Sequence, residues 1–199
     1  MIVHYGYQIT STFSTPDAEA ERIRESVGLA DISCVSTFNL QGRGLKNPPE
    51  LGPDACVWPL GHRQYLVTCK PAARDAVRDR MQQFQRNGAD PSLPPPIYVT
   101  EVTSVYAQLL LAGPHSRDVL NKLTSLNLSE DARGSLTCAQ ANVAHVHAMV
   151  LRKDLKGVLA YHLLVGREYG ENVWESVMHA GHEFHITPFG LEALRLLRG

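Results

Sequence analysis

Residues Ala107–Leu120 read AQLLLAGPHSRDVL, and this stretch decides the fold. The apolar run from Val105 to Ala112 predicts a strand, and Gly113-Pro114 predicts the turn that ends it. A helix is expected to follow over Ser116–Leu123, with Ser116 as its N-cap. Strand, turn and helix in close succession indicate a chain that mixes α and β structure.

The same plan occurs earlier in the chain. Asp31–Val35 (DISCV) matches Glu101–Val105 (EVTSV) in its order of acidic, apolar and small side chains. Each run leads into an apolar strand that ends at a glycine, Gly42 in the first case and Gly113 in the second. Self-similarity at a spacing of roughly 70 residues is typical of duplicated units. The sequence therefore predicts two similar lobes that carry equivalent strands.

Further elements follow from hydrophobic periodicity and from the positions of glycine and proline. Thr15 can cap the first helix, and Pro16 suits its first turn. In the fourth helix Trp174 lies at helical spacing with other apolar residues and is expected to be a core anchor. Residues 88–96 include four prolines and are interpreted as the linker between the lobes. We expect helices over 16–27, 71–85, 116–123, 169–180 and from Gly190 onward, and strands over 32–41, 56–60, 64–69, 105–112, 143–151 and 158–165.

The bulk composition argues against several classes of partner. The chain has 199 residues, 44% of them hydrophobic, and a formal net charge of −1 at pH 7. No basic stripe favours a nucleic-acid partner, and no apolar run approaches the ~20 residues that would span a membrane. Residues 1–15 lack the basic-then-apolar pattern of a signal peptide, so a cytoplasmic location is expected.

Cysteine and histidine spacing gives little support for a metal site. The four cysteines form no C-x-x-C pair, and Cys34 and Cys69 fall in apolar runs where a thiol is typically a small buried hydrophobe. His145 and His147 alternate along an expected strand, but no cysteine or carboxylate nearby in sequence completes a ligand set. The series His179, His182 and His185 is interrupted by Gly181. No metal ligand is assigned, and no P-loop, dinucleotide or Gly-x-Ser-x-Gly motif is present.

Three segments carry a resemblance to a known family. They are Ser26–Ser33 (SVGLADIS), Ala107–Leu120, and Arg152–Val165 together with the later Pro188–Leu191 and Leu197-Arg198. In this order and spacing they resemble the glycine-cleavage T-protein (aminomethyltransferase) family. The short form is similar to the γ subunit of heterotetrameric sarcosine oxidase.

The resemblance implies a fold and a cofactor. It implies an α+β fold in which two ferredoxin-like lobes form the aminomethyltransferase folate-binding domain, without the C-terminal β-barrel of the full enzymes. Residues 1–199 would be one such domain, with sub-lobes at about 1–90 and 97–199. Tetrahydrofolate would bind near the junction of the lobes.

Two positions depart from the family pattern. Family enzymes carry an aspartate before the first-lobe hairpin strand, where two carboxylate oxygens suit the adjacent N–H donors of a pterin. The corresponding run here, Ala55–Leu60 (ACVWPL), has no acid after Asp54. In the second lobe Tyr161 fits the family's aromatic position, but His162 stands where a glutamate is usual. No catalytic residue is therefore assigned.

The resemblance nevertheless implies candidate folate-binding residues. Arg152 lies where the family commonly has arginine and could hold a folate glutamate tail through a bidentate pair; a solvated arginine at a strand end is the alternative. Arg195 and Arg198 compete for a second family position, although basic residues in a last turn also suit the helix dipole. Tyr161 and His162 complete the candidate cofactor-binding set.

Two functions from different classes remain open. The first is a folate-binding protein linked to tetrahydrofolate one-carbon metabolism that lacks full transferase activity alone; an enzyme, if it is one, would be a tetrahydrofolate-dependent aminomethyl or methyl transferase. The second is a non-catalytic assembly subunit of a multi-subunit, sarcosine oxidase-like oxidoreductase. A folate molecule and protein partner subunits, or a homo-oligomer, are the expected partners, whereas nucleic acid and membrane are not.

Overall fold

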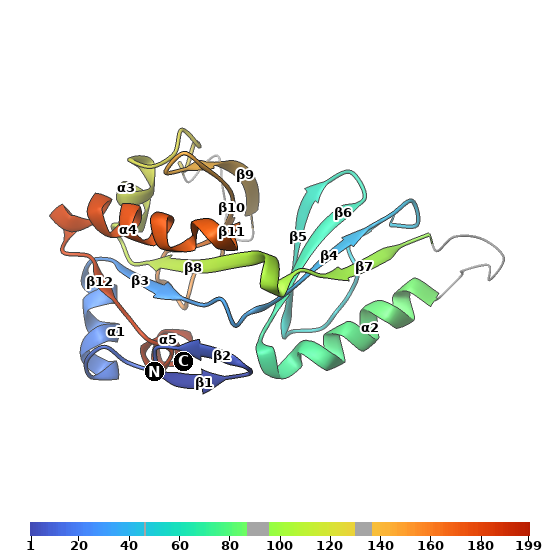
Figure 1. The fold of residues 1–199 in the computed structure, drawn as a ribbon, viewed down its shortest axis with the longest axis horizontal. Coiled ribbons are helices and arrows are strands. Elements are labelled where there is room, and N and C mark those ends of the chain that lie inside the picture. Colours follow the sequence, from blue (N-terminus) through green and yellow to red (C-terminus); the bar gives the residue numbers. More distant parts are fainter. Residues whose placement is uncertain (46, 87–95, 130–136) are drawn as a thin grey trace. The chain divides into compact units, whose positions relative to one another are not determined.

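The computed structural model describes residues 1–45, 47–86, 96–129 and 137–199, and it mixes helices with antiparallel sheets (Figure 1). The chain forms two compact units. Unit 1 comprises residues 1–33 and 104–199, and unit 2 comprises residues 34–103. The units are interleaved along the chain. The physical reason is that the strand over Gly28–Asp31 hydrogen-bonds to the strand over Tyr106–Ala112.

Unit 1 is built on a six-stranded sheet. Its strand order is β12-β3-β8-β11-β10-β9, and only the pairing of β12 with β3 is parallel among its described ladders. In the central ladders Leu29 lies opposite Leu111, and Tyr161 lies opposite the same residue from the other side. The strands are β3 (Gly28–Asp31), β8 (Tyr106–Ala112), β9 (Thr137–Val143), β10 (Val146–Arg152), β11 (Ala160–Gly166) and β12 (Thr187–Pro188).

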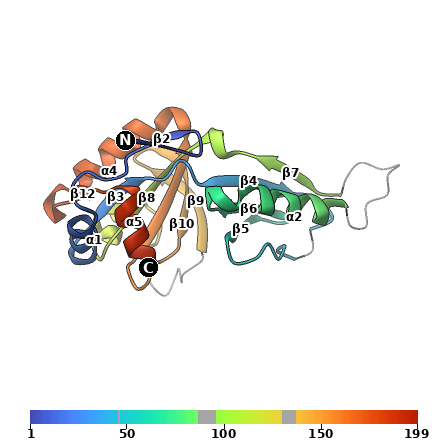
Figure 2. The ribbon, with the colours of Figure 1, turned by 90° about the horizontal axis from the view of Figure 1, so that it is seen from below.

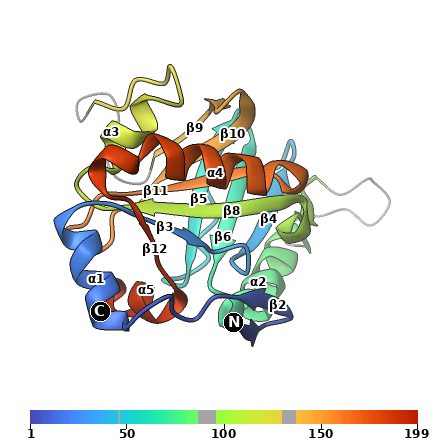
Figure 3. The same cartoon turned by 60° about the vertical axis from the view of Figure 1, so that its left-hand side comes forward.

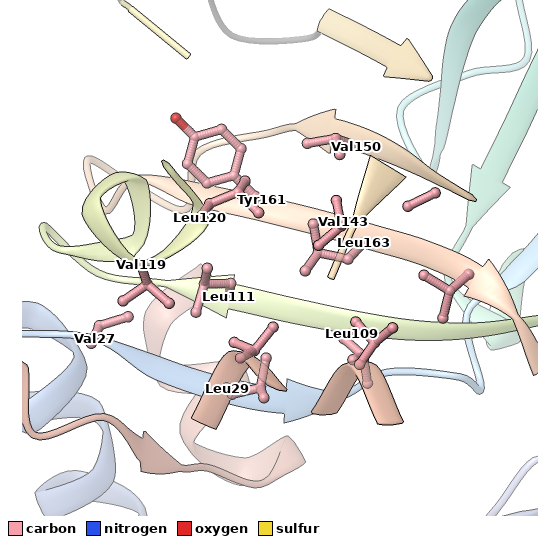
Figure 4. Packing of buried hydrophobic residues seen from close by; sticks show 14 of the residues in the cluster. Val27, Leu29, Leu109, Leu111, Val119, Leu120, Val143, Val150, Tyr161 and Leu163 are labelled. Atoms are coloured by element: carbon pink, nitrogen blue, oxygen red, sulfur yellow. The ribbon is translucent and has the colours of Figure 1, made fainter. Parts of the chain in front are cut away.

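Helices cover both faces of this sheet. The helices α3 (Ser116–Asn121) and α4 (Gly170–Ala180) lie on one face, and α1 (Pro16–Glu25) and α5 (Leu191–Arg198) lie on the other (Figure 1). The core under α3 and α4 is apolar and contains the residues labelled in Figure 4, among them Leu109, Leu111, Tyr161 and Leu163. Because both faces are covered, β8 is buried continuously from Gln108 to Ala112 instead of alternating.

Short elements complete unit 1. The N-terminal hairpin pairs β1 (Ile2–His4) with β2 (Tyr7–Ile9), through a turn at Tyr5-Gly6 in which both residues have positive φ. The 3₁₀ turns η3 (Arg167–Tyr169) and η4 (His182–Phe184) lie at or near the ends of strands and helices, and η2 (Thr103–Val105) begins with the last residue of unit 2.

Unit 2 contains a four-stranded antiparallel sheet and one α-helix (Figure 2). The strand order is β5-β6-β4-β7, with β4 over Ser36–Gln41, β5 over Ala55–Gly61, β6 over Gln64–Cys69 and β7 over Tyr98–Glu101. The turn η1 (Pro71–Ala73) leads into α2 (Arg74–Arg86). Val77 and Met81 of α2 pack in one apolar core with Phe38, Leu40 and Val67 of the sheet.

Most elements expected from the sequence are confirmed, but the starts of three of them differ from expectation. The strand expected over 32–41 is shorter and begins at Ser36, because Asp31 accepts a hydrogen bond from the Ser33 N–H (2.8 Å) in a turn between β3 and β4. The prediction that Ser116 is an N-cap is wrong. His115 occupies that position, and the buried Ser116 hydroxyl donates to the Gly113 carbonyl (2.6 Å). Thr15 is the N-cap residue of α1 but makes no side-chain capping bond.

Two other expectations concern chain connections and membranes. Most of the linker expected over 88–96 lies outside the described residues.

Gly113 ends β8 as expected, with a φ of +125°. A Cβ at this position would lie 2.2 Å from the Ser26 carbonyl oxygen, so only glycine fits. In the described part of the chain, no helix has the length and apolarity needed to cross a membrane.

Candidate functional site

Unit 1 contains a cavity of about 390 Å³ whose lining combines charged and aromatic side chains. Asp31 and Glu171 bring carboxylates, Arg167 brings a guanidinium, and Phe13, Trp174 and Phe189 bring aromatic rings. Ala107 and Leu109 of β8 supply an apolar wall, and Thr10 and Ser33 supply hydroxyl groups. A cavity of this volume falls in the range of small-molecule sites, and its lining is more polar than apolar.

The two carboxylates come from different elements. Asp31 ends β3, opposite Leu109 of β8, and its Oδ1 accepts the Ser33 backbone N–H at 2.8 Å. Glu171 lies in the first turn of α4, where the helix dipole favours a negative charge. Trp174 follows Glu171 by three residues, so the two side chains share one face of α4. The fold thus places a carboxylate beside an indole ring.

Arg167 is held at the edge of the cavity by two contacts. Its Nη1 donates to the Ser104 carbonyl at 3.4 Å, and its guanidinium lies 5.8 Å from the centre of the Tyr7 ring. A guanidinium over an aromatic face gains a cation–π attraction of about 0.5–1 kcal/mol when exposed. Arg167 therefore links the N-terminal hairpin to the cavity.

None of the five residues predicted to bind a cofactor lines this cavity. Arg152, at the end of β10, donates two hydrogen bonds to Asp154, from Nε to Oδ1 at 3.2 Å and from Nη2 to Oδ2 at 3.1 Å. These bonds raise the pKa of the Arg152 guanidinium above its usual value. The guanidinium fork that could hold a ligand carboxylate is thus already engaged with a carboxylate of the same chain.

Tyr161 and His162 follow each other on β11 and therefore point to opposite faces of the sheet. Tyr161 is 1% exposed and packs in the core under α3, as Figure 4 shows. Its hydroxyl is buried without a hydrogen-bond partner in the described part of the chain. A ligand that stacked on this ring would have to displace core side chains.

His162 is a neutral imidazole in the interior. Burial, with smaller contributions from Arg198 and Lys153, lowers the pKa of His162 to about 3. Its Nε2 is also buried with no hydrogen-bond partner among the described residues. A neutral imidazole has one acceptor nitrogen, so His162 cannot accept two parallel N–H donors as a glutamate can.

The two C-terminal arginines lie on α5. The Arg195 guanidinium pairs with Glu192 at 2.7 Å on the helix surface. Arg198 is half-buried and close enough to His162 to disfavour protonation of the imidazole. The structure therefore brings Arg198 near His162 and keeps Arg195 exposed.

One further expectation is confirmed in part, and another needs correction. Trp174 packs against the core as expected, but it is not fully buried. It is half-buried because one side packs on the α3–α4 core while the other lines the cavity. The expectation that His145 and His147 share one strand is wrong, because His145 lies with Ala144 in a left-handed turn between β9 and β10.

Cysteines and potential metal ligands were also located. Cys34 and Cys69 are buried, as the sequence predicts. Burial, followed by the charge of Glu101, raises the pKa of Cys69 to about 11, which keeps the thiol protonated. Across residues 1–45, 47–86, 96–129 and 137–199, no group of three or more His, Cys, Asp or Glu side chains could hold a metal ion.

The sequence reasoning missed the cavity residues as a site. From the sequence, Asp31 belongs to an expected strand entry, Glu171 falls within the helix expected over 169–180, and Trp174 is expected to be a core anchor of that helix. The spacing of Glu171 and Trp174 was a usable signal, because it places both on one helix face. Phe13 and Phe189 gave no signal, because their juxtaposition depends on the tertiary fold.

Comparison with known proteins places this geometry in context. Residues 51–199 match the family model described as the GCVT N-terminal domain. The chain is 38% identical over 208 residues to sarcosine oxidase subunit alpha of Corynebacterium sp. (strain U-96), which covers 90% of this chain. It spans only about a fifth of that subunit, 21% of its length.

Two solved structures share the fold. Aminomethyltransferase T of the glycine cleavage system from Bartonella henselae superposes with a TM-score of 0.73 at 14% identity, over 98% of this chain and 56% of that chain. One chain of heterotetrameric sarcosine oxidase from Corynebacterium sp. U-96 superposes with a TM-score of 0.62 at 17% identity, over 86% of this chain and 95% of that chain. Because the family model matches most of the sequence, this chain belongs to the family of the GCVT N-terminal domain.

Proposed function

We propose that this chain binds a reduced folate in the cavity of unit 1 and serves tetrahydrofolate-linked one-carbon metabolism, without completing a one-carbon transfer alone. One observation carries the proposal: Asp31 and Glu171 line one cavity together with Trp174 and Phe13. A pterin is a flat ring with adjacent N–H donors. Carboxylates accept such donors, and aromatic rings stack on such faces.

The residues of the cavity fit a pterin better than the five residues predicted from the sequence. Asp31 uses one oxygen for the Ser33 N–H, which leaves its second oxygen as an acceptor toward the cavity. Glu171 is exposed at the start of α4 and can supply a further acceptor. When bound, tetrahydrofolate would supply the nitrogens that accept a one-carbon unit, and these side chains would hold and orient it.

The absence of transfer activity in the isolated chain is part of the proposal. The first-lobe run Ala55–Leu60 forms β5 and brings no carboxylate. Asp54, just before it, lies on the surface and faces Lys70 at 3.7 Å. Misplacement of a reacting group by ~1 Å can cost about 100-fold in rate. The two acids of the cavity, Asp31 and Glu171, are exposed, so the site is expected to turn over poorly.

Folate binding is tested by calorimetric titration with tetrahydrofolate. We expect Asp31→Asn and Glu171→Gln each to weaken binding at least tenfold, because an amide offers one acceptor oxygen where a carboxylate offers two. The matched control is Glu175→Gln, an exposed acid one turn farther along α4 that does not line the cavity. Equal affinity in all four proteins, or no binding by the wild type, would reject the proposal.

Transfer activity is tested separately. The purified chain is supplied with tetrahydrofolate and either formaldehyde or an aminomethyl donor, and methylene-tetrahydrofolate is followed above the uncatalysed background. We expect no increase. Turnover that disappears in Asp31→Asn would show that the chain is an enzyme and that its acid comes from β3.

A second function is favoured by a different observation. The superposition on sarcosine oxidase covers 95% of one chain of that heterotetramer, so a chain of this size and fold can be a whole subunit of an oxidoreductase. We therefore also propose an assembly role, with protein partner subunits or a homo-oligomer. Co-expression with the products of neighbouring genes, followed by size-exclusion chromatography with light scattering, tests this. A chain that stays monomeric in every combination would contradict it.

The architecture carries a related proposal. Each unit contains a hairpin, a third strand paired to its second strand, and a helix after the hairpin. We propose that these are the two ferredoxin-like lobes of one aminomethyltransferase-type domain over residues 1–199. A crystal structure in which β4–β6 with α2 fails to superpose on β8, β10 and β11 with α4 would refute it.

A further inference from the structure

Glu19 is a buried carboxylate outside the set of candidate binding residues. It lies on α1, is 2% exposed, and accepts three hydrogen bonds from backbone N–H groups. Its Oε1 accepts from Phe13 at 2.6 Å and from Ser14 at 2.5 Å, and its Oε2 accepts from Gly190 at 2.9 Å. A buried charge is tolerated only when it is well hydrogen-bonded, and here three donors converge on it.

These bonds join two segments that are distant in the sequence. Phe13 and Ser14 lie between β2 and α1, whereas Gly190 precedes α5. Figure 3 shows the chain after β2 running past α5 on its way to α1. Glu19 therefore ties both segments to one helix.

The backbone reinforces the junction. The first N–H groups of α5 have no partner within the helix; those of Leu191 and Glu192 donate to the carbonyls of Thr10 (3.2 Å) and Ser11 (3.1 Å). A Cβ on Gly190 would lie 2.0 Å from the Ser11 carbonyl oxygen, so the two chains are in direct backbone contact. Residues 10–14, which we term the strap, are thus held against the start of α5.

The strap and the start of α5 are also walls of the cavity. Phe13 and Thr10 line it from the strap, and Phe189 lines it from the residue before Gly190. Phe13 is 52% exposed, so core packing alone does not fix its ring. The carboxylate of Glu19 bonds directly to the backbone N–H of Phe13 and to that of the residue after Phe189.

We propose that Glu19 is a positioning residue that sets the separation of the two aromatic walls, Phe13 and Phe189, by clamping the strap to the start of α5. The inference rests on the proposed function only for the identity of the ligand. The clamp itself is a property of the free chain.

The test is Glu19→Gln. An amide has one acceptor oxygen and directs its NH₂ group at backbone donors, so at least one of the three bonds is lost. We expect amide hydrogen exchange at Phe13, Ser14 and Gly190 to accelerate at least tenfold and tetrahydrofolate affinity to fall at least tenfold. Emission of Trp174, the half-buried indole of the cavity, should shift as its surroundings change.

Two controls separate positioning from general stability. Glu21→Gln changes an exposed acid on the same helix and should match the wild type in every measurement. Ile23→Val removes a buried methyl group from α1 and should lower the denaturation midpoint. Exchange at the three amides should then accelerate no more than the loss of global stability explains, and ligand affinity should be unchanged. If Glu19→Gln does not fold, Glu19→Asp keeps the charge, shortens the reach by one methylene, and should show the same pattern more weakly.

Each outcome is decisive. Unchanged exchange at Phe13, Ser14 and Gly190 would overturn the clamp. Faster exchange with unchanged ligand affinity would overturn its positioning role. If the wild type binds no tetrahydrofolate, the proposed function fails, and the inference then stands or falls on the amide exchange and the Trp174 emission, which need no ligand.

Discussion

The two sheets share a strand arrangement but differ in how they are covered. In unit 2 the order β5-β6-β4-β7 places a hairpin beside a third strand and then a fourth, and in unit 1 the consecutive strands β10-β11-β8-β3 do the same. A helix follows each hairpin, α2 in one case and α4 in the other. Unit 1 adds β9 and β12 at its edges and helices on both faces.

This difference explains where the cavity forms. A strand covered on both faces is buried along its length, as β8 is from Gln108 to Ala112, and the cavity forms at its other end, where Ala107 and Leu109 line it. In β4 of unit 2 the buried run gives way to the half-buried Asn39 and the exposed Gln41. Strands at similar places in the two strand orders therefore differ in burial because of the elements that surround them.

The largest expected effect comes from truncating one core residue in each unit. Leu163 in unit 1 and Met81 in unit 2 are both fully buried, so Leu163→Ala and Met81→Ala should each cost about 2–5 kcal/mol of stability. If the units are thermodynamically separate, calorimetry will show two transitions, with each variant lowering a different one. A single transition lowered equally by both variants would show that the units unfold together and would break the comparison.

An intermediate effect is expected from His162, a buried histidine of unit 1; the histidine of unit 2, His62, is exposed. The folded-state pKa of His162 is about 3, against a usual value of 6.5. At any pH between these two values, the imidazole is protonated in the unfolded chain and neutral in the folded chain. Stability is therefore unaffected above about pH 6.5 and falls below it, by roughly 2 kcal/mol at pH 5.

The measurement is urea unfolding at pH 7 and pH 5. His162→Leu should abolish the part of the loss that His162 causes, with little change at pH 7. The substitution also removes a buried polar atom that has no hydrogen-bond partner among the described residues. His147→Gln, on the exposed side of β10, is the matched control and should retain the wild-type pH dependence. An equal loss of stability in His162→Leu and the wild type would contradict the assignment.

The smallest effect sharpens the comparison through two bidentate ion pairs. Arg152–Asp154 in unit 1 has side chains 11% and 29% exposed, and Arg74–Glu101 in unit 2 has side chains 45% and 30% exposed. Double-mutant cycles should give a coupling energy of about 1 kcal/mol for the first pair and about 0.5 kcal/mol for the more solvated second pair.

The Arg74–Glu101 pair also has a predicted pH dependence. The hydrogen bonds from Arg74 lower the pKa of the Glu101 carboxyl. The contribution of the ion pair to folding stability is therefore fully present above the unfolded-state pKa of Glu101. It is lost as the pH falls through the lower, folded-state pKa. Coupling that grows on acidification would refute this sign.

Local signals in the sequence predicted much of the secondary structure. The hairpin of β5 and β6, strand β8 and helix α4 follow from alternation, helical spacing and glycine or proline boundaries. The break between β3 and β4 was not predicted, because apolar residues continue through Ile32–Val35 while the chain passes from one sheet to another. Hydrophobic periodicity indicates which residues are buried, but it does not indicate which of the two sheets buries them.

The candidate site was less predictable for a physical reason. The contacts of Glu19 are to backbone N–H groups, which every residue except proline has, so their position leaves no mark in the sequence. The cavity unites residues from the strap, β3, β8, η3, α4 and the segment after β12. Arg152 and His162 were correctly located on strands, but the sequence could not show that Asp154 engages the former or that the interior encloses the latter.

The interleaving of the units has a consequence for synthesis on the ribosome. All of unit 2 lies between β3 and its hydrogen-bonding neighbour β8, so residues 34–103 can fold while much of unit 1 has not yet been translated. Helix α1, whose buried side includes Ala20 and Ile23, is synthesised early. Helix α5, on the same face of the sheet, comprises residues 191–198 and is synthesised much later. The apolar side of α1 therefore stays uncovered by α5 for most of translation, when it could promote aggregation. A translational pause before α5 would lengthen the time for which this side is uncovered.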